Sequence, residues 1–147
     1  MSTWFSYTKP SEWKYRFACS DWPNGKDVYA ASATVSRVVS VYDGDTFTAD
    51  IDEFPPLIGK KIGIRVAGID TPEMRDKRIE IKALAVKARD YVRAVLAQAK
   101  VIELRNLRRG KYFRIVADVY VDGASLAEGL LSLGLAHPYD GGRKVGW

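Results

Sequence analysis

Apolar and β-branched residues recur with the spacing of β-strands in three segments of the first half of the chain. These segments cover residues 34–41 (TVSRVVSV), 46–51 and 61–69 (KIGIRVAGI). The pair Asp43-Gly44 predicts a turn between the first two segments. Residues 52–59 contain two prolines and a glycine, so a loop is expected before the third strand.

The strongest helical pattern lies between residues 81 and 99. Apolar side chains recur there at three- and four-residue steps, which predicts an amphipathic helix with one apolar stripe. Lysine and arginine side chains lie off this stripe. Its members are Ile81, Leu84, Ala85, Ala88, Tyr91, Val92, Val95, Leu96 and Ala99.

Two further strands and a second helix are predicted after the long helix. The strands cover residues 101–104 and 112–121, and the helix covers residues 125–133. Ser125 is suited to the N-cap of this helix and Gly134 to its C-terminal end. The tail from Pro138 onward is rich in glycine and proline, and we expect it to be irregular.

The order of these elements indicates an OB-type barrel. Three strands, a helix, two strands and a helix match this five-stranded fold, whose open face often binds nucleic acid. The expected class is α+β, mainly β, with two or three helices. A chain of 147 residues has room for one domain. We place that domain at residues 34–147, after an aromatic-rich N-terminal extension at residues 1–33 that is expected to pack against it; the alternative is that its aromatic rings stack on bases.

Composition excludes several classes of protein. With 47% hydrophobic and 28% charged residues, the chain is not mainly disordered. No apolar stretch approaches the roughly 20 residues of a membrane span. Cys19 is the single cysteine, which rules out an internal disulfide framework, and His137 is the single histidine, which rules out a mechanism that needs two imidazoles.

The distribution of charge is more informative than the net charge of +5. Residues 74–114 contain 13 basic and 4 acidic side chains, whereas the segments before and after this block each carry a net charge of −2. The chain can therefore present a basic face to phosphate groups while keeping an acidic cluster elsewhere.

Two acidic motifs are candidates for chemistry. In Asp43-Gly44-Asp45 the alternatives are a hairpin turn and a metal site, because Asp45 adds a carboxylate that a turn does not need. In the segment from Arg65 to Glu73, Thr71-Pro72-Glu73 could begin a helix. Alternatively, Arg65 on the polar strand face and Asp70 at the strand end form a site with Glu73. Asp45 and Asp70 are oxygen ligands of the kind that Ca²⁺ prefers.

A basic motif at residues 108–114 (RRGKYFR) completes the candidate site. One interpretation is a solvated basic loop, and the other is a phosphate grip in which arginine binds oxygens and tyrosine stacks on a base. Together the three motifs supply the side chains that phosphodiester hydrolysis requires. These are ligands for a metal ion, two arginines that stabilise the developing charge and a carboxylate that acts on the attacking water.

The order of motifs over residues 34–139 resembles that of the staphylococcal nuclease (thermonuclease) family. The motifs are D-G-D-T, R-x-x-x-x-D-T-P-E and K-Y-x-R, followed by D-G near a final helix and by G-L-A. The resemblance implies an OB-fold enzyme that cleaves DNA and RNA with Ca²⁺, without regard to the sugar, and releases 3′-phosphorylated products.

The resemblance also implies roles for individual residues. Asp45, Asp70 and the carbonyl of Thr71 resemble the calcium ligands, and Asp43 a nearby acid that supports them. Glu73 resembles the residue that acts on the water, as base or as orienter. Arg65 and Arg114 resemble the arginines on the scissile phosphate, Lys111 and Tyr112 the contacts to a terminal phosphate, and Tyr139 a base-stacking tyrosine.

The sequence departs from the family pattern at three places. Phe113 replaces the glycine that is usual before the second arginine. The Pro55-Pro56 segment lengthens the second hairpin, and the N-terminal extension has no family role.

The expected partners are DNA and RNA, single-stranded or frayed, with no membrane and with the protein as a monomer. The alternative function is a non-catalytic nucleic-acid-binding module on the same fold. The chain as given has no signal peptide, so the expected location is cytoplasmic if the chain is complete. If a signal was removed, the protein is expected to be secreted or periplasmic.

Overall fold

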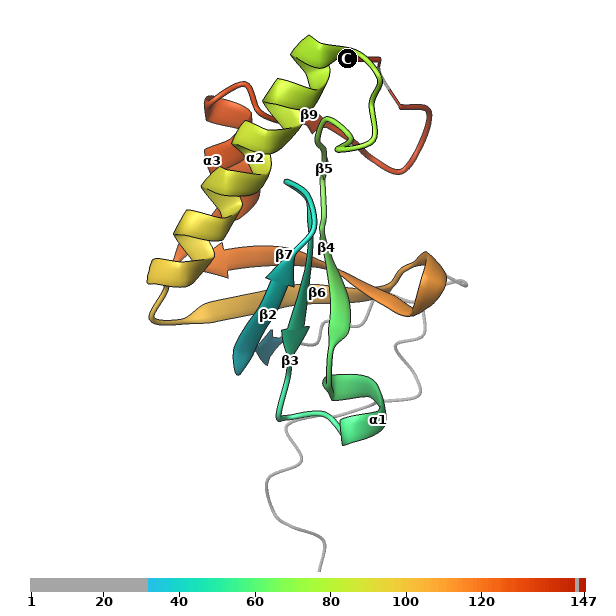
Figure 1. Ribbon diagram of the computed structural model, residues 1–147. Helices are drawn as coiled ribbons and strands as arrows, with labels where there is room; N and C mark the ends of the chain where they lie inside the picture. Colours follow the sequence, from blue (N-terminus) through green and yellow to red (C-terminus); the bar gives the residue numbers. More distant parts are fainter. Residues whose placement is uncertain (1–31, 145) are drawn as a thin grey trace, which may run out of the picture.

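The computed structural model describes residues 32–144 and 146–147 and is built around a seven-stranded sheet (Figure 1). Neighbouring strands follow the order β1-β6-β7-β4-β3-β2, β8 pairs with β7, and β5 and β9 form a separate ladder. Apart from its last two residues, the expected N-terminal extension lies outside the described residues.

The strands are β1 (Ala33–Thr34), β2 (Arg37–Val41), β3 (Thr46–Asp50), β4 (Ile62–Val66), β5 (Ile69–Asp70), β6 (Ile102–Arg109), β7 (Arg114–Val121), β8 (Ala124–Ser125) and β9 (His137–Pro138). The helices are α1 (Pro56–Gly59), α2 (Ile79–Gln98) and α3 (Leu126–Ser132), together with a 3₁₀ turn at Lys111–Phe113.

The sheet curls because one extended segment pairs with both of its ends. β1 pairs with β6, whereas β2 pairs with β3. Between these ladders, the Val35 amide donates to the Ile102 carbonyl at 2.9 Å and the Ser36 amide donates to the Asp50 carbonyl at 2.8 Å. The strand expected at residues 34–41 is therefore divided between two partners. Within the described residues, the five long strands and three helices confirm the predicted α+β class with an OB-type sheet.

Alternate side chains of the strands pack inside the curled sheet. The predicted alternation in β4 is confirmed, since Ile62, Ile64 and Val66 are buried. The apolar stripe of α2 covers one opening of the sheet. Other fully buried side chains of the core include Phe47, Leu104, Val119 and Leu130.

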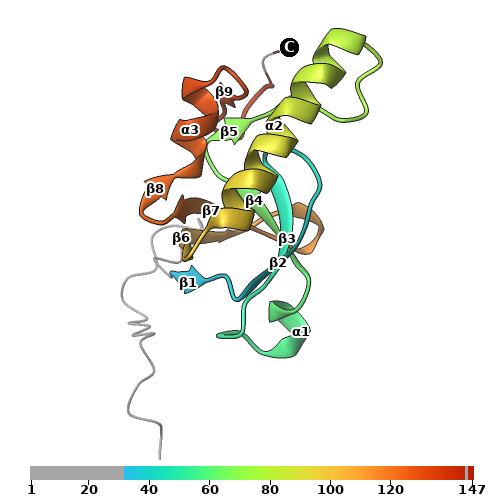
Figure 2. The same cartoon turned by 60° about the vertical axis from the view of Figure 1, so that its left-hand side comes forward.

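Figures 1 and 2 show α2 and α3 side by side over one end of the sheet and α1 at the other end. The two helices approach closely at Gly129, where a Cβ atom would lie 2.6 Å from the Tyr91 hydroxyl. Among the described residues, no helix combines the length and the apolar character needed to cross a membrane.

The third expected strand ends earlier than predicted, and this break positions part of the site. β4 ends at Val66, and Gly68 adopts a φ of 78°, which glycine tolerates and which turns the chain. The following strand β5 leaves the main sheet and pairs with β9, with Asp70 opposite His137. The expectation of an irregular tail from Pro138 is therefore wrong at Pro138 itself, which pairs with Ile69.

The basic motif is also arranged differently from the expectation. β6 continues to Arg109, and β7 begins at Arg114 rather than at residue 112. Tyr112 and Phe113 have φ values of 58° and 57°, which lie outside the strand region and turn the chain between β6 and β7.

The alternative that Thr71-Pro72-Glu73 begins a helix is wrong. α2 begins at Ile79, and residues 71–78 form a loop that leads from β5 to the helix. Glu73 therefore lies in this loop, three residues after the end of β5 at Asp70.

Candidate active site

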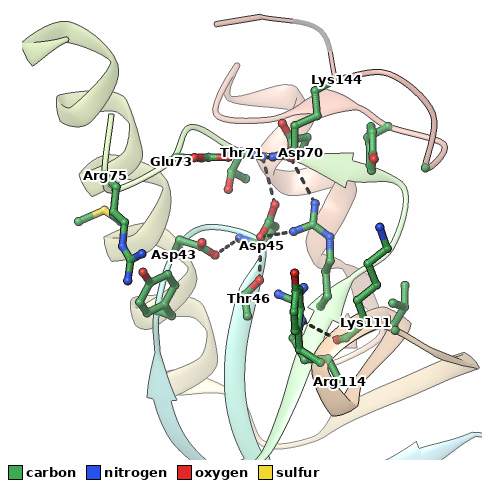
Figure 3. Close-up of a pocket in the computed structure, with 18 of the residues that line it drawn as sticks. Asp43, Asp45, Thr46, Asp70, Thr71, Glu73, Arg75, Lys111, Arg114 and Lys144 are labelled. Atoms are coloured by element: carbon green, nitrogen blue, oxygen red, sulfur yellow. Dashed lines mark hydrogen bonds and ion pairs between the residues drawn. The ribbon is translucent and has the colours of Figure 1, made fainter. Parts of the chain in front are cut away.

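A cleft of about 800 Å³ opens where the turn after β2, the end of β4, the loop after β5 and the tail meet the 3₁₀ turn (Figure 3). Every site residue predicted from the sequence lines this cleft. These residues are Asp43, Asp45, Arg65, Asp70, Thr71, Glu73, Lys111, Tyr112, Arg114 and Tyr139. The structure therefore brings three motifs that are distant in sequence to one place.

Asp45 is held by several donors although it is only 3% exposed. Its Oδ1 accepts a hydrogen bond from the Thr46 hydroxyl at 2.8 Å, and its Oδ2 accepts one from the Thr71 amide at 3.3 Å. The Asp45 amide in turn donates to Oδ1 of Asp43 at 3.3 Å. These contacts join the turn after β2 to the loop after β5.

Gly44 allows this turn to lie against α2. A Cβ atom at Gly44 would be 2.7 Å from the Cβ of Ala88 and 2.9 Å from Cγ2 of Thr71. Contacts this short require a neighbour to move. The glycine between the two acids is therefore needed for packing.

We expect Gly44→Ala to lower the free energy of unfolding by about 1–3 kcal/mol, because overpacking has costs of this size. Adding Ala88→Gly should recover part of the loss, although a glycine inside a helix itself costs about 1 kcal/mol. Urea denaturation of the two single variants and the double variant checks this. Strictly additive effects of the two substitutions would contradict the close packing.

Arg65 binds both buried carboxylates. Its Nη1 lies 2.9 Å from Oδ1 of Asp45, and its Nη2 lies 3.2 Å from Oδ1 of Asp70. Nη2 also donates to the Ile69 carbonyl at 3.4 Å. The guanidinium thus fixes the two acids at a common position at the end of β4.

Asp43 lies half-buried beside Asp45, and this environment affects its ionisation. Burial and the neighbouring Asp45 charge raise the pKa of Asp43 to about 7. A cation bound near Asp43 and Asp45 would favour the ionised form of Asp43.

The donor set is suitable for a hard cation, although it is not a complete protein cage. In residues 32–144 and 146–147, no three His, Cys, Asp or Glu side chains are grouped to hold a metal ion. The residues that could supply oxygen ligands are Asp45 and Asp70 through their carboxylates and Thr71 through its carbonyl, and all three line the cleft. Ca²⁺ accepts carboxylate, carbonyl and water oxygens, roughly six to eight in total, so water would complete this set.

Glu73 differs from the other acids because its side chain is 67% exposed. Its Oε1 accepts a hydrogen bond from Nζ of Lys144 at 3.0 Å, and the same ammonium lies 3.1 Å from Oδ1 of Asp70. Burial acts to lower the pKa of Lys144, but the bonds to Glu73 and Asp70 outweigh this effect and raise it.

Arg114 enters the cleft from the start of β7. A Cβ atom at Gly63 would lie 2.9 Å from Cγ of Arg114, so the glycine leaves room for the arginine side chain on β4. Nε of Arg114 donates to the Lys111 carbonyl at 3.2 Å, and its guanidinium lies 5.7 Å from the centre of the Tyr112 ring. Phe113 does not prevent Arg114 from lining the cleft.

Tyr139 is brought to the cleft by the tail. Its amide donates to the Gly68 carbonyl at 2.9 Å, which continues the pairing of β5 with β9. The centre of its ring lies 6.0 Å from the guanidinium carbon of Arg65. The ring therefore forms part of the cleft wall beside Arg65.

The sequence analysis gave no role to several of the lining residues, among them Tyr42, Met74, Arg75 and Lys144, and it included Arg109 only as a member of the basic motif. Arg75 and Arg109 belong to the basic block, but charge alone does not show which of its members face the cleft. Lys144 lies 71 positions after Glu73, and no spacing pattern relates these two residues.

Known proteins with similar sequences include nucleases. A family model described as staphylococcal nuclease homologue matches residues 63–144. The chain is 30% identical to a thermonuclease of Staphylococcus hyicus, over 72% of this chain and 60% of the relative. It is 33% identical to the probable endonuclease LCL3 of Colletotrichum graminicola, over 82% of this chain and 51% of the relative.

The endonuclease YncB of Bacillus subtilis is also 33% identical, over 71% of this chain and 46% of the relative. The chain thus spans between about half and three fifths of the length of these relatives. The family model covers more than half of the chain and includes the strands and loops that carry Arg65, Asp70, Glu73 and Arg114. The chain belongs to the family of staphylococcal nuclease homologues.

Proposed function

We propose that the protein is a nuclease that hydrolyses phosphodiester bonds of DNA and RNA, depends on Ca²⁺ and releases 3′-phosphorylated products. The observation that carries this proposal is the convergence, in one cleft, of two buried carboxylates on Arg65, the exposed carboxylate of Glu73 and the guanidinium of Arg114. A surface that only bound phosphate would gain nothing from acids at its centre, because they repel the ligand.

The two arginines would hold the scissile phosphate. Arg65 has N–H groups beyond those that contact Asp45 and Asp70, and Arg114 reaches the same cleft from the adjacent strand. Both would stabilise the negative charge that develops on the phosphoryl oxygens in the transition state. Lys111 and Tyr112, on the neighbouring turn, would contact a further phosphate of the chain.

Glu73 would act on the attacking water. It would either accept a proton from the water or orient it, and the exposure of its carboxylate leaves room for that water. The water oxygen forms a bond to phosphorus, the P–O5′ bond breaks, and a proton passes to the leaving 5′ oxygen. A Ca²⁺ ion held by Asp45, Asp70 and the Thr71 carbonyl would polarise the phosphoryl group.

The test is digestion of labelled single-stranded DNA and RNA with Ca²⁺, repeated with EGTA. We expect both substrates to be cleaved with Ca²⁺, cleavage to stop with EGTA, and the products to carry 3′-phosphates that a phosphatase removes. Failure to cleave either substrate with any divalent cation would contradict the proposal. Retention of nucleic-acid binding in that case would identify a non-catalytic module on the same fold.

A further inference from the structure

The tail after β9 forms one side of the cleft and is tied to the loop that carries Glu73. Nη1 of Arg78 donates to the Trp147 carbonyl at 2.6 Å, and Lys144 reaches Glu73 on the same loop. At its start, the tail is fixed by the pairing of β9 with β5. The tail and loop 71–78 therefore meet at two places, and Lys144 is the contact that lies in the cleft (Figure 3).

Lys144 joins two acids of very different exposure. Its ammonium lies 3.1 Å from the Asp70 carboxylate, which is 6% exposed, and 3.0 Å from the Glu73 carboxylate, which is 67% exposed. Asp70 is already fixed by Arg65. Within the described part of the chain, Glu73 has no other side-chain hydrogen bond or ion pair, so Lys144 alone connects it to a rigid group.

We propose that Lys144 is a positioning residue that holds the Glu73 carboxylate beside Asp70, where it can act on the water. This inference rests on the proposed nuclease function. The Lys144–Glu73 ion pair is exposed and contributes little to stability, because solvent screens it and two long side chains lose freedom; the buried Asp70 keeps its ion pair with Arg65 when Lys144 is replaced. The orientation of a reacting group affects the rate much more strongly, since small misplacements have large costs in the transition state. We therefore expect Lys144 to affect the rate of the reaction more than the stability of the fold.

The experiment compares Lys144→Met, which removes the charge and keeps the length, with Lys144→Arg, which keeps the charge. We expect Lys144→Met to lower kcat about tenfold, with KM and the affinity for a bound nucleotide changed less than about twofold. Lys144→Arg should restore most of kcat. Arg143→Met is the matched control, because it removes a neighbouring positive charge from the same tail and should leave kcat near the wild-type value.

A second comparison separates positioning of Glu73 from a general effect of charge. In a Glu73→Gln background, Lys144→Met should cause little further loss of kcat, because the carboxylate that Lys144 positions is absent. Melting temperatures should be the same in all variants. Equal effects of Lys144→Met and Arg143→Met, a full tenfold loss in the Glu73→Gln background, or a rise in kcat would each overturn the proposal.

The failure of this inference is distinguishable from failure of the proposed function. If the wild-type protein cleaves nucleic acid and Lys144→Met cleaves equally well, only the role of Lys144 is wrong. If the wild-type protein does not cleave nucleic acid under any condition, the proposed function is wrong, and the positioning role of Lys144 is then wrong as well.

Discussion

Glu73→Gln is expected to lower nuclease turnover by at least about 100-fold and to leave nucleotide affinity nearly unchanged, because it removes the carboxylate proposed to act on the attacking water and none of the proposed phosphate contacts. Glutamine has the shape of glutamate and can still accept the hydrogen bond from Lys144, so the loop should keep its position. The substitution therefore removes the charge and the basicity alone. Single-turnover rates on labelled DNA, together with titration of a bound nucleotide, measure the two quantities separately.

Glu80→Gln provides the control for this prediction. Glu80 is an exposed acid in the first turn of α2 and does not line the cleft. Its replacement should leave turnover within about twofold of the wild type, as expected for a surface substitution. A Glu73→Gln protein with near-wild-type turnover would show that another group acts on the water.

Arg65→Met is expected to abolish most activity and also to lower the free energy of unfolding by about 3 kcal/mol, because it leaves the buried Asp45 charge without its ion-pair partner, whereas Asp70 keeps Lys144. Asp45 and Asp70 are 4% and 6% exposed in their side chains, and both bind this guanidinium. Added Ca²⁺ should recover part of the lost stability if these acids hold the ion. Thermal unfolding with Ca²⁺ and with EGTA measures both effects.

Arg114→Met is the matched comparison. Arg114 lines the same cleft, but the hydrogen bond of its side chain goes to the Lys111 carbonyl and not to a buried acid. We expect a comparable loss of activity with a change in unfolding free energy below about 0.5 kcal/mol, typical of a surface position. Equal destabilisation by the two substitutions would mean that the ionic network of Arg65 does not support the fold.

Much of the fold could be predicted because its elements are locally amphipathic. Alternation in β4 and the apolar stripe of α2 each follow from the need to bury one face. The break at Gly68 could not be predicted, because a glycine in a strand pattern is compatible with both a straight strand and a turn. The pairing of β5 with β9 depends on tertiary contacts between segments about 70 positions apart.

The sequence identified many of the residues that line the candidate site, but not the ion pairs that join them. Asp45, Asp70 and Glu73 were identified from their motifs, and the structure places all three in one cleft. The bridge from Arg65 to both buried acids and the bridge from Lys144 to Glu73 could not be predicted, since each depends on where separate segments meet.

The parallel pairing of β4 with β7 has a consequence for the spacing of the two arginines. Gly63 lies opposite Arg114 and Arg65 lies opposite Val116, so both arginines are on the same face of the sheet, two positions apart along it. With a rise of roughly 3.3 Å per residue and a strand spacing of roughly 4.8 Å, their Cα atoms are about 8 Å apart. The pairing of the two strands thus sets the distance between the Cα atoms of Arg65 and Arg114. A slip of β7 by one residue would turn Arg114 toward the core, so strand register decides whether both arginines face the cleft.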